Sequence, residues 1–137
     1  MSEKNVFIID DSSFARRVNR KIFTDMGYEC LGEAEEHLSA FKGLEELKVK
    51  HQSPYVITLD IVMPDVTGDQ MLGKVLQMHP ESIVIMLTSV ADSETVKVCL
   101  SQGAKGYIVK PVNEEKVRDA LEIISIKERM RKKTNMA

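Results

Sequence analysis

The fold is decided by residues 55–68, which read YVITLDIVMPDVTG. The first five residues form a continuous apolar run rich in β-branched side chains, and Asp60 follows directly after Leu59. A continuous run of this length is typical of a strand covered on both faces, as in a parallel sheet, rather than of a half-exposed antiparallel strand. Similar runs occur at residues 6–9 and 83–87. The sequence therefore predicts buried parallel strands in all three places.

Short apolar runs alternate with stretches of helical periodicity along the whole chain. The runs cover residues 6–9, 28–31, 55–59, 83–87 and 107–109, and the helical stripes lie within 14–26, 38–47, 71–78, 96–100 and 117–124. Strictly alternating βα units imply a parallel sheet with helices on both faces, and 137 residues are too few for a closed eight-unit barrel. We therefore predict an α/β fold of the flavodoxin-like (βα)5 class, a doubly wound parallel sheet with strand order 2-1-3-4-5.

The helical stripes also predict which residues start the helices and which face the core. Side chains that suit an N-cap precede four of the stripes: Ser12 or Ser13, Thr67, Asp92 and Asn113. In the first stripe, Phe14, Val18 and Ile22 recur every four residues. We expect these three side chains on the buried face of the first helix.

Composition indicates one globular domain, residues 1–126, that stays in the cytoplasm. The chain is 43% apolar and 29% charged, with 19 Lys+Arg against 21 Asp+Glu and a formal charge of −2. No apolar run approaches the roughly 20 residues that cross a bilayer, and no cleavage site follows the N-terminus, so neither membrane insertion nor export is expected. Cys30 and Cys99 lack a metal-binding spacing, and we interpret both as reduced core thiols.

A basic tail, residues 127–137, follows and is expected to extend the last helix. Residues 127–133 contain five basic side chains and one acidic one, a net charge of +4. Cations complement the dipole at a helix C-terminus, so we interpret the tail as a solvated helix end, with docking to an acidic partner as the alternative. DNA binding is not expected, because the tail has no aromatic residues among its cations and the rest of the chain is acidic.

Polar residues gather where the predicted strands end. In a doubly wound sheet, ligands bind at the carboxyl ends of the strands, where the sequence places Asp10, Asp11, Asp60, Thr88, Ser89, Lys110 and Pro111. Three carboxylates repel one another and need a compensating cation, and oxygen ligands favour Mg²⁺ or Mn²⁺ over zinc. A carboxylate beside a metal, a hydroxyl and an ammonium group has what phosphoryl transfer to an aspartate requires.

These motifs closely resemble those of response-regulator receiver domains of the CheY-like, single-domain type. The matching residues are Asp10-Asp11-Ser12, Asp60 to Pro64 with Gly68, Thr88-Ser89 and Lys110-Pro111, and the resemblance runs from about residue 4 to 126. It implies that Asp60 accepts a phosphoryl group from the phosphohistidine of a sensor histidine kinase. It also implies that Asp11, Asp60 and the backbone carbonyl of Val62 ligate Mg²⁺, with Asp10 acting through water or orientation.

The resemblance assigns roles to residues of the last two strands as well. Thr88 and Lys110 would contact the phosphoryl group, the Lys110–Pro111 peptide bond would be cis, and Thr88 with Tyr107 would form the switch. We further expect the apolar side chains of Val62 and Val90 to crowd the water that hydrolyses the aspartyl phosphate, which would make its decay slow. Slow decay would suit a separate phosphatase.

The implied function is that of a stand-alone phospho-switch of a two-component system, plausibly in chemotaxis. An output protein would dock on the surface of the fourth helix, fifth strand and fifth helix, and the chain is expected to be a monomer. A phosphorelay shuttle, which passes the phosphoryl group to a histidine phosphotransfer protein, is the alternative. The segment after Ala34 lacks the family's usual glycine and is longer than usual, so the second helix or the loop after it, within residues 36–54, is expected to be extended. His37, His51 and His79 are expected at the surface or at helix ends.

Three other classes fit the motifs less well. A phosphatase of the haloacid-dehalogenase type needs a second aspartate two residues after the nucleophile, where this chain has Val62. A flavodoxin-like nucleotide binder would place backbone amides after the first strand, but Asp10 and Asp11 would repel a phosphate there. A degenerate receiver is disfavoured because every matched site position is filled.

Overall fold

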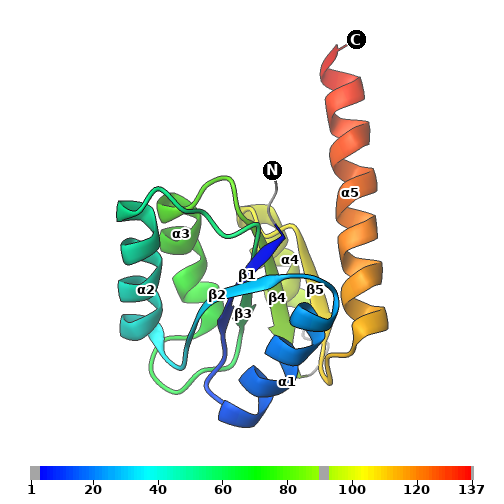
Figure 1. Ribbon diagram of the computed structural model, residues 1–137. Coiled ribbons are helices and arrows are strands. Elements are labelled where there is room, and N and C mark those ends of the chain that lie inside the picture. The colour runs from blue at the N-terminus through cyan, green and yellow to red at the C-terminus, as the bar shows by residue number, and fades with distance from the viewer. Residues whose placement is uncertain (1–3, 90–92, 137) are drawn as a thin grey trace.

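Five parallel strands form one sheet in the computed structural model, which describes residues 4–89 and 93–136 (Figure 1). The strands are β1 (Asn5–Ile9), β2 (Glu29–Ala34), β3 (Val56–Asp60), β4 (Ile83–Thr88) and β5 (Gly106–Val109), in the spatial order β2-β1-β3-β4-β5. The helices are α1 (Ser13–Asp25), α2 (His37–Val49), α3 (Gly68–Met78), α4 (Ser93–Gln102) and α5 (Glu114–Met136). The predicted flavodoxin-like fold and strand order are confirmed.

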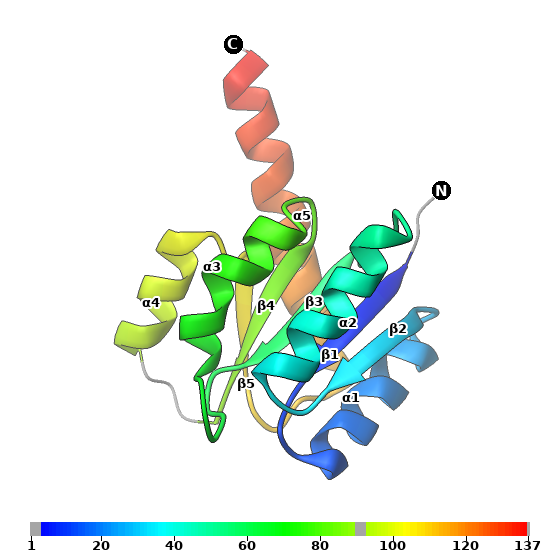
Figure 2. The ribbon, with the colours of Figure 1, turned by 90° about the vertical axis from the view of Figure 1, so that its left-hand side faces the viewer.

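The sheet is covered on both faces, as the continuous apolar strands predicted (Figure 2). On one face, Phe7, Ile57 and Leu59 pack among buried residues of α2, α3 and α4. On the other face, Ile8 and Ile85 pack among buried residues of α1 and α5. Successive strand residues point to opposite faces, so a strand buried between two helical layers needs apolar residues at every position.

The first helix shows where the expected pattern holds and where it is wrong. Ser12 caps α1, since its side chain accepts a hydrogen bond from the Ala15 N–H at 3.1 Å. Phe14, however, is 69% exposed, and the buried residues of α1 are Asn19 and Phe23. A stripe at spacing four advances by about 40° around the helix at each step, because a turn takes 3.6 residues. Its first member therefore turns away from the sheet.

Two other predicted caps are present. Thr67 is the N-cap of α3, and the Asn113 side chain accepts a hydrogen bond from the Lys116 N–H at 2.8 Å at the start of α5. The predicted cap Asp92 lies outside the described residues.

Among the helices within the described ranges, none is both long and apolar enough to cross a membrane. Both cysteines are free, Cys99 buried and Cys30 partly buried.

His79 lies at a helix end, one of the two places expected for it, but it is buried rather than at the surface. It is the C-cap of α3 and is only 1% exposed. Its Nε2 lies 2.8 Å from the carbonyl oxygen of Leu44, and its Nδ1 lies 3.2 Å from Ser53 Oγ. Both ring nitrogens therefore have hydrogen-bond partners, which is how a buried imidazole is accommodated between α2 and the end of α3.

Candidate functional site

The three predicted carboxylates lie together at the carboxyl ends of β1 and β3. One carboxylate oxygen from each of Asp10, Asp11 and Asp60 lies within 4.8 Å of the other two. Asp10 and Asp60 are buried, whereas Asp11 is exposed. The adjacency follows from the topology, since β1 and β3 are neighbours at the point where the strand order reverses.

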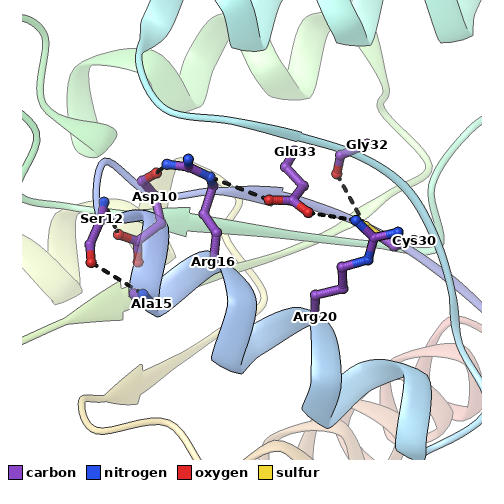
Figure 3. Close-up of polar contacts among 8 residues, drawn as sticks. All are labelled: Asp10, Ser12, Ala15, Arg16, Arg20, Cys30, Gly32 and Glu33. Carbon is purple, nitrogen blue, oxygen red and sulfur yellow. Dashed lines mark hydrogen bonds and ion pairs between the residues drawn. The ribbon is translucent and has the colours of Figure 1, made fainter.

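Asp10 is held in place through its backbone and one carboxylate oxygen (Figure 3). Its Oδ1 accepts the Ser12 N–H at 2.9 Å, and its carbonyl oxygen accepts a hydrogen bond from Arg16 Nη1 at 2.7 Å. Arg16 in turn pairs with Glu33 on β2 at 3.3 Å, and Glu33 also pairs with Arg20 at 2.9 Å. These contacts tie the end of β1 to α1 and β2.

The supporting role of Arg16 was missed by the sequence reasoning. A basic residue in the first turns of a helix opposes the helix dipole, so the rules for helix ends do not predict Arg16 there. The signal that could have found it is its position just after the Asp10-Asp11 pair, where a cation can satisfy a strand-end carbonyl. Arg16 is a positioning residue in this site, because its contact is with the backbone of Asp10.

Lys110 joins the two buried carboxylates. Its Nζ lies 3.0 Å from Asp60 Oδ2 and 3.0 Å from Asp10 Oδ2. The other oxygen of Asp60 accepts the Val62 N–H at 3.2 Å. A single ammonium therefore lies between two carboxylates that would otherwise repel each other.

The site shifts the pKa values of its members. Burial, assisted by the negative charge of Asp10, raises the pKa of Asp60 to about 6, although Lys110 and the Val62 N–H act against this. Burial works to lower the pKa of Lys110, but hydrogen bonds to Asp60 and Asp10 outweigh it and raise this pKa. Lys110 therefore stays protonated at neutral pH, whereas Asp60 titrates closer to neutrality than an ordinary aspartate.

The loop after Asp60 is folded back tightly onto the strand end. The Ile61 N–H donates to the Leu87 carbonyl at 2.9 Å, and the Gly68 N–H donates to the Ile61 carbonyl at 2.8 Å. A Cβ at Gly68 would overlap the Asp60 carbonyl oxygen, so this close approach requires glycine. Val62 lies within the loop and its side chain is 62% exposed.

The ends of β4 and β5 complete the rim. Thr88 is buried at the end of β4, and its carbonyl accepts the Lys110 N–H at 2.7 Å. The Lys110–Pro111 peptide bond is cis. Tyr107 lies on β5 with 48% of its surface exposed. Val90, for which a role in water access is expected, lies outside the described residues.

The donor set fits a hard divalent cation. Asp10 Oδ2 is buried, and its partner among the described residues is the Lys110 ammonium at 3.0 Å. Three carboxylates and one ammonium leave excess negative charge, and all the candidate ligand atoms are oxygens. Asp10, Asp11 and Asp60 would hold such an ion.

A second group of candidate ligands lies in the segments that follow β2 and β3. One ligand atom from each of Glu36, His37 and Asp65 lies within 4.8 Å of the other two. Both carboxylate oxygens of Glu36, however, accept backbone N–H groups of α2, from Leu38 at 3.1 Å and Ser39 at 2.6 Å. Glu36 is therefore the N-cap of α2, and this capping accounts for its position.

The fold and the site together define a class of α/β domain that has an acidic cluster at the carboxyl ends of β1 and β3. A model of the response regulator receiver domain matches residues 6–122, and the chain belongs to this family. It is 35% identical over 117 residues to the chemotaxis protein CheY of Listeria monocytogenes, covering 85% of this chain and 94% of that one. It is 33% identical to the CheY of Thermotoga maritima, covering 89% of this chain and 98% of that one.

Solved structures agree with this assignment. The chain resembles a protein in the CheX–CheY–BeF3–Mg²⁺ complex from Borrelia burgdorferi with a TM-score of 0.76 and 31% identity, covering 88% of this chain and 87% of that one. It also resembles a CheY-like receiver domain from Methanospirillum hungatei with a TM-score of 0.74 and 29% identity, covering 99% of this chain and 100% of that one. The protein is thus a CheY-like receiver domain of a two-component system, a phospho-acceptor signalling domain rather than a classical enzyme.

Proposed function

We propose that the protein is a stand-alone response regulator, phosphorylated on Asp60 by a sensor histidine kinase in the cytoplasm, that changes its affinity for an output protein. One observation carries the proposal: the Lys110 ammonium lies 3.0 Å from both buried carboxylates, in a cluster that also contains the exposed Asp11. This arrangement provides a nucleophile, a fixed cation and oxygen ligands for a second cation. A role in chemotaxis is favoured because relatives named chemotaxis protein CheY match most of the chain.

The side chains at the rim would act in complementary ways. An Asp60 carboxylate oxygen attacks the phosphorus atom, and the phosphorus–nitrogen bond of the donor phosphohistidine breaks. Bound Mg²⁺ would neutralise charge on the transferring oxygens. Lys110, which holds its proton, moves from a carboxylate partner to a phosphoryl oxygen, and Thr88 offers its hydroxyl to another.

The metal requirement gives the first test. Asp11 is the exposed member of the carboxylate cluster, so its removal should weaken the metal site without unfolding the core. With acetyl phosphate as donor, we expect Asp11→Ala to need at least about tenfold more Mg²⁺ for half-maximal phosphorylation, measured by intact mass. Asp65→Ala removes an exposed carboxylate from the loop after β3 and should keep the wild-type Mg²⁺ dependence. If Asp11→Ala and Asp65→Ala needed the same Mg²⁺ concentration for half-maximal phosphorylation, the assignment of Asp11 as a metal ligand would be contradicted.

The switch is proposed to run from Thr88 to Tyr107. A bound phosphoryl group favours the conformer in which the Thr88 hydroxyl contacts it. The movement of Thr88 toward the phosphoryl group makes space for the ring of Tyr107, which is partly exposed, to turn inward. Thr88→Ala should therefore accept the phosphoryl group but lose most of the change in the Tyr107 ring resonances seen by NMR when acetyl phosphate is added. Ser89→Ala, at the exposed neighbouring residue, is the matched control. An unchanged Tyr107 response in Thr88→Ala would exclude this mechanism.

The output surface is proposed to lie on α4, β5 and α5. The exposed large apolar residues on these elements include Leu100, Tyr107 and Ile123, which line one hollow together. Exposed apolar residues that lie next to one another are a feature of protein-binding surfaces. The chain would act as a monomer that exposes this surface.

A further inference from the structure

The C-terminal half of α5 forms a groove with the end of the sheet at which the strands begin, which we call the amino edge. The helix runs past that edge, so its last turns stand clear of the strands (Figure 1). Between helix and edge lies a hollow of about 510 Å³. Its lining from the body of the domain comes from Tyr55 before β3, Ile83 at the start of β4 and Lys105 before β5. We call this hollow the α5 groove. It lies at the opposite end of the sheet from Asp60.

An ion-pair network holds α5 in this position. Glu128 accepts a hydrogen bond from Lys105 Nζ at 3.1 Å through one oxygen and from Arg131 Nη2 at 3.1 Å through the other. The hydrogen bond from Lys105, followed by that from Arg131, lowers the pKa of Glu128. Glu128 thus stays ionised and links the helix to Lys105, the residue before β5, so the groove has a defined wall.

The groove has more basic than acidic residues in its lining. Lys105, Arg129, Arg131 and Lys132 line it together with the carboxylates of Glu81 and Glu128. Lys105 and Arg131 pair with Glu128, whereas neither Arg129 nor Lys132 forms an ion pair with any residue in 4–89 or 93–136. The apolar part of the lining, which we call the floor, includes Tyr55, Ile83 and Ile124. Unpaired cations beside apolar residues favour a ligand that carries both carboxylates and apolar groups.

The groove continues toward the proposed output surface. Two smaller hollows, of about 270 Å³ and about 90 Å³, follow it along α5, and all three are lined in part by Lys105 and Ile124. Lys127 lines both smaller hollows, and the last one reaches Tyr107. The concave path therefore runs from the amino edge to the surface that the switch would alter. A path of linked hollows fits an extended chain better than a compact small molecule.

We propose that this path binds an extended acidic segment of a protein partner, whether or not Asp60 is phosphorylated. Charge complementarity selects an acidic ligand, and the apolar floor selects one with interspersed aliphatic or aromatic residues. A lipid surface is less suited, because the described part of the extension carries no tryptophan, tyrosine or phenylalanine of the kind that interfacial helices insert. Tethering the partner there would raise its effective concentration beside the output surface.

The test measures peptide binding by the full-length protein. The probe is a fluorescein-labelled 16-residue peptide with the repeat Glu-Leu-Asp-Glu, and the reference peptide has Gln and Asn in place of Glu and Asp. We expect fluorescence anisotropy to show salt-sensitive binding of the acidic peptide only. Arg129→Glu with Lys132→Glu should weaken it at least about tenfold, because both cations lack partners and their reversal leaves the fold intact.

The control variant is Arg17→Glu with Lys42→Glu, which changes the net charge equally on exposed residues of α1 and α2. Its dissociation constant for the acidic peptide should lie within about twofold of the wild-type value. Asp60→Asn should also bind the acidic peptide as wild type does, so failure of the phosphorylation proposal would leave this result unaffected. Equal weakening in both double variants, or no preference for the acidic peptide, would overturn the proposal. Binding only to vesicles of phosphatidylglycerol, lost in Arg129→Glu with Lys132→Glu, would also overturn it and assign the path to membranes.

Discussion

Asp60→Asn is expected to reduce phosphoryl incorporation from acetyl phosphate by at least about a hundredfold, because the amide lacks the anionic oxygen that attacks phosphorus. The substitution keeps the shape of the side chain. Lys110 and the Val62 N–H donate to different oxygens of Asp60, so the single amide oxygen of the substituted side chain can accept only one of these two hydrogen bonds. A circular-dichroism spectrum like that of wild type would show that the loss of phosphorylation reports the chemistry of the residue rather than disruption of the rim. Intact-mass measurement in Mg²⁺ gives the incorporated phosphate directly.

A nearby aspartate supplies the matched control. Asp65→Asn makes the same chemical change at an exposed position in the loop after β3. It should leave phosphorylation close to the wild-type level. Full phosphorylation of the Asp60→Asn protein would show that another residue is the acceptor.

The stability of the same variant gives a second readout that does not depend on phosphorylation. Since the pKa of Asp60 is raised to about 6, its charge destabilises the folded state above pH 6, and this cost disappears as the pH falls toward 4. In EDTA, Asp60→Asn should thus be more stable than wild type by about 2 kcal/mol at pH 7.5 and by little at pH 4. Urea unfolding at the two pH values measures the difference. A larger gain at pH 4 than at pH 7.5 would reverse the sign and contradict the burial of this charge.

Gly68→Ala is expected to be the most destabilising small substitution near the site. A Cβ there would overlap the Asp60 carbonyl oxygen and lie against the backbone of Ile61, neither of which can rotate away as a side chain would. The loop must shift, which breaks the hydrogen bond from the Gly68 N–H to the Ile61 carbonyl. We expect a loss of about 2–4 kcal/mol in the free energy of unfolding.

Gly73 in the same helix is the control for Gly68. A Cβ at Gly73 meets no atom within 4 Å, and the residue is exposed. Gly73→Ala should stabilise the protein by about 0.5–1 kcal/mol, because alanine loses less conformational freedom than glycine when the helix forms. Urea unfolding of the two variants should then move in opposite directions. A Gly68→Ala protein as stable as wild type would show that the loop tolerates the displacement.

Much of the fold could be predicted because it depends on local patterns. The alternation of apolar runs and helical stripes indicated the βα units, and the handedness of βα crossovers left few strand orders for a sheet of this size. Strand ends were harder to place: β2 runs from Glu29 to Ala34, beyond the apolar residues 28–31 that predicted it. This strand lies at the edge of the sheet with several partly exposed positions, so hydrophobicity did not mark its end.

The sequence by itself determined the chemistry available at the rim. Asp10, Asp11, Asp60, Thr88 and Lys110 each follow or end an apolar run, and parallel topology brings strand ends to one edge. Only the tertiary structure decided how they are paired and supported. The position of Lys110 between two carboxylates and the contact of Arg16 with the Asp10 backbone depend on side-chain placement across separate elements.

The same distinction explains His79 and the α5 groove. A polar residue at a helix end looks exposed in the sequence, but His79 is buried because Leu44 and Ser53 supply partners for both ring nitrogens. The basic character of residues 127–133 was visible in the sequence, whereas the wall facing Arg129 and Lys132 comes from Tyr55 and Ile83, more than 40 residues earlier. Periodicity and charge are local properties of a chain, but burial and pairing arise only when distant segments pack together.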